Sequence, residues 1–299
     1  MEQPKWECVL DAKAGLGEVP FWFEDEQALY WIDGFRPSLN RTTFGKTIAD
    51  TQTREWLTPE EIGSFVLCKQ RDMAVVSLET GIFSLNMTTG ATKKLNEATY
   101  DVTNHQYNDG RCDPAGRFWV GTRRRLGAKA PDGSGFFYRM DDRGLVPVID
   151  DITMANGIAW SPDGKTMYVA DRPKWQITAF DFNVKDGTVS NRRKFCTVPA
   201  GYIPDGAAVD SEGGYWLAYY RSGLIVRFKP NGELDRELKA PTMLPTMIAF
   251  GGPDLKTMFV TTSVVDPMKP DAPREPNAGA IFRCDVGAKG IPEHRYAFL

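Results

Sequence analysis

Hydrophobic and polar positions along the chain alternate in a recurring unit, a polar turn followed by a short strand of aromatic and aliphatic residues. The unit occurs as EDEQALYWIDG (24–34), KQRDMAVVSLETG (69–81), DPAGRFWVGT (113–122), SPDGKTMYVAD (161–171), DSEGGYWLAY (210–219) and GPDLKTMFVTT (252–262). Runs of β-branched and aromatic residues bounded by Gly, Pro, Asn and Asp are typical of strands between tight turns. The pattern therefore predicts an all-β chain without a helix of more than a few turns.

The predicted strands recur at a nearly constant spacing. One bulky residue marks each of them, with successive gaps of 44, 44, 49, 48 and 43 residues: Trp31, Val75, Trp119, Tyr168, Trp216 and Phe259. A period in the mid-forties with short strands indicates a β-propeller with one four-stranded blade per repeat. Six markers predict a six-bladed propeller, and WECVLDA (6–12) is expected to close the ring as the outer strand of the last blade. A large β-sandwich or two small β domains remain the alternatives.

Length and composition fit one propeller domain over residues 1–299. Hydrophobic residues make up 42% and charged residues 25% of the chain, an ordinary balance for a globular domain. The formal net charge of −3 lacks the basic footprint of a nucleic-acid-binding protein. We find no apolar run of membrane-spanning length and no signal-peptide pattern. We therefore expect a cytoplasmic monomer or small homo-oligomer without a nucleic-acid or membrane partner.

Few side chains are available for thiolate or imidazole chemistry. The five cysteines are scattered without CxxC spacing, which argues against a disulfide framework and a thiolate zinc site. The only histidines are His105 and His294, and the GxSxG, HExxH and P-loop motifs are absent. Any chemistry is therefore expected to use carboxylates, amides, or a metal held by oxygen atoms.

Four polar residues occupy equivalent places in the repeat. Asn108 and Asp205 lie 11 residues before their markers, Asn156 lies 12 before and Glu18 lies 13 before. These positions begin the innermost strands of a propeller, so we expect their side chains to converge at one end of its channel. Clustered carboxylates repel unless a cation neutralises them, and hard oxygen donors suit Ca²⁺, Mg²⁺ or Mn²⁺, with Zn²⁺ and Fe²⁺ still open. Each residue alone also fits a turn or a solvated loop.

The stretches that carry these residues resemble the regucalcin (senescence marker protein) and gluconolactonase family of six-bladed propellers. The matches follow the family's order over nearly the whole chain: GLGEVPFW (15–22), NDGRCDPAGRFWVGT (108–122), ANGIAWSPDGKTMYVAD (155–171), PDGAAVDSEGGYWLA (204–218) and FGGPDLKTMFVTT (250–262). The resemblance implies a lactonase for small, sugar-derived lactones with one divalent metal ion, Ca²⁺ being the first expectation. It implies Glu18, Asn156 and Asp205 as metal ligands and Asn108 as a substrate-binding residue.

The implied reaction is metal-assisted ester hydrolysis. The cation would polarise the lactone carbonyl, and Asp205 would act as the general base for water. A metal-bound carboxylate is a weaker base, so the two roles of Asp205 compete. Two other functions stay open: hydrolysis of phosphoesters or organophosphates, and a non-catalytic calcium-binding propeller.

The chain departs from the family pattern on both sides of Asn108. Gln106 stands where the family usually has an arginine, and GTRRRLG (121–127) stands where related lactonases continue with acidic residues. Val19 also replaces a customary glycine. Positive charge from Arg123, with Arg124 and Arg125, would compensate for Gln106, which predicts Gln106 and Arg123 as substrate contacts and an acidic or unusual lactone. The alternative is that the arginine run is a solvated loop.

Overall fold

Almost all regular structure in the protein is β-structure. The structure, a computed structural model, describes residues 3–267, 269 and 271–299. Within these ranges the only helices are three short 3₁₀ turns: η1 (Glu24–Glu26), η2 (Ile48–Asp50) and η3 (Arg172–Lys174). None of the described helices has the length and apolar character needed to cross a membrane. The predicted all-β class is confirmed.

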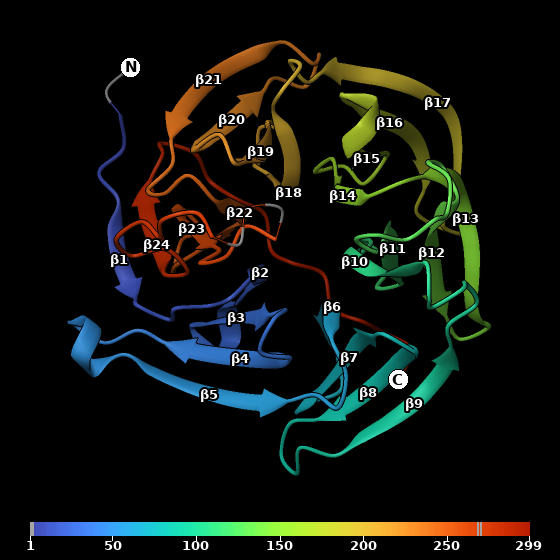
Figure 1. The fold of residues 1–299 in the computed structure, drawn as a ribbon, viewed down its shortest axis with the longest axis horizontal. Coiled ribbons are helices and arrows are strands. Elements are labelled where there is room, and N and C mark those ends of the chain that lie inside the picture. The colour runs from blue at the N-terminus through green and yellow to red at the C-terminus, as the bar shows by residue number, and fades with distance from the viewer. Residues whose placement is uncertain (1–2, 268, 270) are drawn as a thin grey trace. The chain divides into compact units, whose positions relative to one another are not determined.

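The strands form six four-stranded antiparallel sheets, which are the blades of a six-bladed β-propeller. Strands of one blade lie side by side, as β14 to β17 and β18 to β21 do in Figure 1. Five blades follow chain order, whereas the last has the order β1-β24-β23-β22. The N-terminal strand β1 (Glu7–Leu10) pairs with β24 (Ile281–Asp285), so the predicted closing strand is confirmed.

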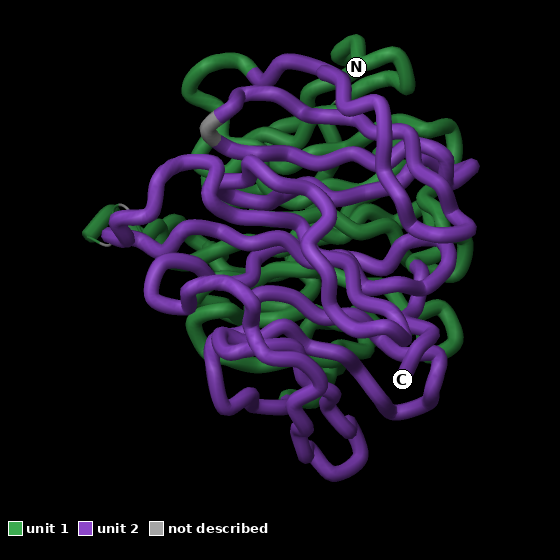
Figure 2. The backbone as a smooth tube through the Cα atoms, turned by 90° about the vertical axis from the view of Figure 1, so that its right-hand side faces the viewer, with its two compact units in different colours: residues 1–55, 199–293 green, residues 56–198, 294–299 purple. Residues whose placement is uncertain are grey.

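The chain divides into two compact units, which Figure 2 shows in different colours. Unit 1 comprises residues 1–55 and 199–293, and unit 2 comprises residues 56–198 and 294–299.

Unit 1 contains the first, fifth and last blades. Their strands are β2 (Gly17–Phe23), β3 (Ala28–Asp33), β4 (Ser38–Thr43) and β5 (Gln52–Leu57), whose last two residues count to unit 2; β18 (Ile203–Val209), β19 (Tyr215–Tyr220), β20 (Leu224–Phe228) and β21 (Leu234–Lys239); and β22 (Pro245–Gly251), β23 (Thr257–Thr262), β24 and β1. Trp216, Ile248 and Phe250 are buried in one apolar cluster between the fifth and last blades. Side chains from adjacent blades thus form the core, as expected for sheets packed face to face.

Unit 2 contains the second, third and fourth blades. Their strands are β6 (Ile62–Leu67), β7 (Met73–Leu78), β8 (Gly81–Asn86) and β9 (Thr92–Glu97); β10 (His105–Cys112), β11 (Phe118–Arg124), β12 (Gly135–Asp141) and β13 (Gly144–Ile152); and β14 (Ala155–Trp160), β15 (Thr166–Asp171), β16 (Gln176–Asn183) and β17 (Thr188–Thr197). Trp119, Trp160 and Phe182 pack edge to face between the third and fourth blades.

All six marker residues lie in the second strand of a blade and are buried. A carboxylate of the preceding turn fixes two of these strands. Asp113 Oδ2 accepts hydrogen bonds from Trp119 Nε1 (2.9 Å) and Arg117 Nε (2.6 Å). Asp210 Oδ2 accepts equivalent bonds from Trp216 Nε1 and Arg227 Nε, both at 2.7 Å. These acidic turns therefore stabilise the fold.

Candidate functional site

The four residues selected by the repeat lie at the same irregularity, a β-bulge in the first strand of a blade. In β2, β10, β14 and β18, two residues oppose a single residue of the second strand. Glu18 and Asn156 immediately precede the bulge, whereas Asn108 and Asp205 are its first residues. Bulges redirect side chains and are common beside active sites. Turn-like sequence at these positions therefore encodes a bulge within a strand.

Two of these bulges use left-handed backbone. Val19 has φ 48° and Gly157 has φ 60°. Glycine adopts this region without cost, whereas a β-branched residue is an outlier there. Val19, the residue that replaces the glycine of the family pattern, is thus strained directly after Glu18, and such strain is found where surrounding structure holds a functional group in place.

In unit 2, Asn108 and Asn156 are in direct contact. Asn108 Nδ2 donates to Asn156 Oδ1 (2.8 Å) and to the carbonyl of Ala155 (2.7 Å). A Cβ on Gly121, the residue opposite the β10 bulge, would lie 2.0 Å from Ala155 Cβ, so glycine is needed for this approach. Asn156 is buried and Asn108 is half-buried. The structure therefore joins the two predicted amides of this unit.

A buried carboxylate lies beside these amides. Asp109 Oδ2 accepts the N–H of Ile158 (3.1 Å), whereas Oδ1 has no hydrogen-bond partner among the described residues. Burial raises the pKa of Asp109 to about 6, against the opposing effects of Arg111 and neighbouring backbone N–H groups. The sequence does not single out Asp109, since only its burial and the unpartnered Oδ1 distinguish it from a turn aspartate.

In unit 1, the strands that carry Glu18 and Asp205 both pack against β22. Thr246 of β22 donates from Oγ1 to the carbonyl of Gly17 (2.5 Å), next to Glu18. A Cβ on Gly206, next to Asp205, would lie 2.2 Å from Met247 Cγ. Glu18 and Asp205 are both half-buried. The two predicted carboxylates thus lie on strands that flank one common neighbour.

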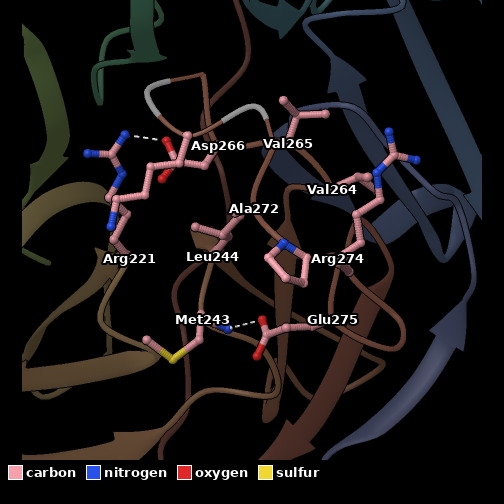
Figure 3. Close-up of a pocket in the computed structure, with 12 residues that line it drawn as sticks. Arg221, Met243, Leu244, Val264, Val265, Asp266, Ala272, Arg274 and Glu275 are labelled. Carbon is pink, nitrogen blue, oxygen red and sulfur yellow. Dashed lines mark hydrogen bonds and ion pairs between the residues drawn. The ribbon is translucent and has the colours of Figure 1, made fainter.

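A cavity of about 250 Å³ in unit 1 is lined by residues that include Arg221, Leu244 and Asp266. Figure 3 shows Arg221 and Asp266 facing each other as an ion pair on one side, with Leu244 in the lining. Tyr220, the residue before Arg221, donates its hydroxyl to the carbonyl of Val265 (3.2 Å). Burial raises the pKa of Tyr220, and the negative charges of Asp205 and Asp266 raise it further. Residues 264–266 and 272–275 therefore line this cavity, and the charge of Asp205 acts on Tyr220, the neighbour of the lining residue Arg221.

Gln106 and Arg123 are joined by a third residue, Glu61. The two are opposite each other in β10 and β11. Both donate to Glu61 Oε1, Gln106 from Nε2 at 2.6 Å and Arg123 from a guanidinium nitrogen at 3.0 Å. We call these three residues the Glu61 cluster. Sequence analysis missed Glu61 because an acid in TPEEIG reads as a solvated loop residue.

The other two arginines of the run also have carboxylate partners. Arg124 pairs with Asp132 at 3.0 Å, and Arg125 pairs with Glu79 and donates to the carbonyl of Val102 at 2.8 Å. Arg125 is only 22% exposed. Each of the three arginines 123–125 therefore forms an ion pair with a different carboxylate.

The predicted metal ligands offer oxygen donors only, two carboxylates and one amide. Such donors fit a hard divalent cation, particularly when some remain accessible to solvent. Glu18 and Asp205 belong to unit 1, and Asn156 belongs to unit 2. In the ranges that the structure covers, no group of three or more His, Cys, Asp and Glu side chains is arranged to hold a metal ion.

Comparison with known proteins defines the class. Residues 16–264 match the family described as SMP-30/Gluconolactonase/LRE-like region, and the chain belongs to this family. The resemblance that the sequence motifs carry is confirmed.

Several relatives are similar over essentially their full length. The chain is 34% identical to a 6-deoxy-6-sulfogluconolactonase of Pseudomonas putida over 97% of this chain and 98% of the relative. It is 32% identical to regucalcin of Oryctolagus cuniculus over 99% and 100%. A solved luciferin-regenerating enzyme superposes with a TM-score of 0.88 at 25% identity, covering 98% of this chain and 99% of its own. The family match and the full-length similarity to a sulfogluconolactonase bear out the prediction that the chain is a lactonase.

Proposed function

We propose that this protein is a metal-dependent lactonase that opens a small, sugar-derived or related lactone. The observation that carries the proposal is the set of four polar residues at equivalent bulges of β2, β10, β14 and β18. Membership of the family and full-length similarity to a sulfogluconolactonase support the same reaction.

The proposed metal ligands are Glu18, Asn156 and Asp205. Their oxygen chemistry supports a divalent cation, and a bacterial relative from Agrobacterium tumefaciens with a TM-score of 0.86 is described as a calcium-binding protein, regucalcin. Ca²⁺ is therefore the first candidate, with Zn²⁺, Mn²⁺, Mg²⁺ and Fe²⁺ as alternatives. When bound, the cation supplies a Lewis acid for a carbonyl oxygen.

The side chains would divide the remaining work. Asp205 accepts a proton from water as the water oxygen bonds to the lactone carbonyl carbon. The ring C–O bond then breaks, and the proton passes to the departing alkoxide oxygen, which leaves a hydroxy acid. Asn108 holds the substrate through its amide, with Gln106 and Arg123 as further contacts.

The surroundings of the reaction are also proposals. A net charge of −3 supports a small-molecule substrate rather than nucleic acid. We propose that the chain acts as one domain over residues 1–299, in the cytoplasm and away from membranes, as a monomer or small homo-oligomer.

A pH-drop assay over a panel of lactones and phosphotriesters, with divalent metal present, tests this function. Acid release from lactones is the expected result. Glu18→Gln, Asn156→Ala and Asp205→Ala should each abolish it while thermal unfolding stays cooperative. Turnover of phosphotriesters alone, or tight metal binding without any turnover, would replace the proposal by one of the alternative functions. Full lactonase activity in Asp205→Ala would remove the proposed general base.

A further inference from the structure

The Glu61 cluster adjoins the proposed substrate site through β10. Gln106 precedes Asn108 by two residues and pairs with Arg123 of β11. Side chains directly opposite in an antiparallel pair project to the same face, which explains why both reach one carboxylate. A lactone held by Asn108 would therefore lie beside these groups.

The cluster contains one negative and one positive charge in direct contact. Gln106 is 5% exposed, so its bond orients the Glu61 carboxylate from a buried position. The side chains of Arg123 and Glu61 are 23% and 30% exposed, which leaves both within reach of a ligand. Opposite charges at hydrogen-bond distance weaken each other's field, so an anion beside the guanidinium keeps only part of the attraction that an unpaired arginine would give it.

The rest of the arginine run adds no net positive charge to this end of the blade. Arg124 is matched by Asp132, and Arg125 is matched by Glu79. The arginine run, which in the sequence points to an anionic substrate, is thus neutralised in the fold by one carboxylate for each arginine.

We propose that Glu61 is a specificity-determining residue, which neutralises Arg123 and makes the lactone site favour hydroxyl substituents over an anionic one. The carboxylate accepts and the guanidinium donates, whereas a hydroxyl group does both. Repulsion by the Glu61 carboxylate would offset much of the attraction between an anionic substituent and the Arg123 guanidinium, so the site would select against anions by repulsion. This inference rests on the proposed lactonase function and names the substrate class of that site.

The test compares two lactones that share a ring, gluconolactone and 6-deoxy-6-sulfogluconolactone. Glu61→Gln keeps the size of the side chain and an oxygen acceptor but removes its charge. We expect the ratio of kcat/KM for the sulfonated lactone to that for the neutral one to rise roughly tenfold, mainly through KM. Arg123→Met, which leaves Glu61 without its cation, should lower the same ratio.

Glu79→Gln is the matched control, since it removes the carboxylate partner of the neighbouring Arg125. Arg125 stays bonded to the Val102 carbonyl, so the ratio should not change. Active wild-type protein with unchanged ratios in both Glu61→Gln and Arg123→Met would overturn the role of Glu61 and leave the lactonase proposal standing. An equal rise in Glu79→Gln would overturn it as well, because the effect would then be a general field. Wild-type protein that hydrolyses no lactone would instead overturn the proposed function.

Discussion

Substitution of two aspartates of the fifth blade, five residues apart, should affect different properties, activity for one and stability for the other. Asp205 lies at the bulge of β18, whereas Asp210 lies in the turn before β19 and is fully buried. Replacing either by asparagine keeps the shape and removes the charge. We expect Asp210→Asn to lose stability with the site intact, and Asp205→Asn to lose activity with stability almost intact.

The expected loss of stability in Asp210→Asn follows from the contacts of Asp210. Its Oδ2 accepts bonds from Trp216 Nε1 and Arg227 Nε, and its Oδ1 accepts the N–H of Gly214 at 2.8 Å. An asparagine that keeps Oδ1 on the turn places an NH₂ group against two buried donors. Breaking a buried ion pair costs about 3–5 kcal/mol. Arg227 retains Asp235 at 2.8 Å, which favours the low end, about 3 kcal/mol.

Urea unfolding and lactone hydrolysis, measured on both variants, provide the assay. Asp210→Asn should unfold at lower urea concentration with an unchanged slope, while its kcat/KM stays within about twofold of wild type under folded conditions. Asp205→Asn should lose at least about a hundredfold in kcat with a midpoint close to wild type. If Asp210→Asn lost activity at full occupancy of the folded state, the separation of structural and functional carboxylates argued here would be wrong.

Three further predictions concern stability and reactivity. The pKa of Asp109 is about 6 in the folded protein, against an ordinary value of 3.8, so the unfolded chain loses this proton at lower pH than the folded protein does. The free energy of unfolding of the wild type should therefore fall by up to about 3 kcal/mol as pH rises from about 4 to 6. Asp109→Asn should remove this fall. Urea titrations in EDTA across that range test it, and identical pH profiles would refute it. Gly206→Ala would place a Cβ 2.2 Å from Met247 Cγ and should destabilise the fold by about 1–3 kcal/mol; an unchanged melting temperature would contradict the close approach. Cys8 is half-buried, whereas the other four cysteines are buried, and burial raises the pKa of Cys68 to about 12. Cys8 should therefore react first with a thiol reagent. Equal reaction rates for all five cysteines would be inconsistent with this burial.

The fold could be predicted from the sequence because its repeat is expressed in side chains that must be buried. Markers such as Trp119 and Trp216 are fully buried in the second strands, so their spacing reports the blade period directly. The closing strand followed from β-propensity at residues 6–12 and the open edge of the last blade. How the contacts of the chain divide into two units is set by packing, which no short pattern reports.

The site could be predicted only in part. Asn108 and Asn156 could be identified by their distance from the marker residues, because the bulge recurs at nearly the same place in each blade. The structure joins these two residues by a hydrogen bond. Glu61 could not be found in this way, since it lies in the loop before β6 and acquires its role only when Gln106 and Arg123 face it. Asp109 was hidden by its turn-like neighbours, because neither its burial nor its unpartnered oxygen has a sequence signal.

Restoring metal to stripped protein tests whether a divalent cation held by Glu18, Asn156 and Asp205 is needed to open a lactone. Lactone hydrolysis is followed by pH-stat after EDTA treatment and gel filtration, while Ca²⁺ and each alternative cation are titrated back. We expect negligible hydrolysis without metal and a rate that saturates near one equivalent of the active cation. Full hydrolysis by metal-free protein would contradict this expectation.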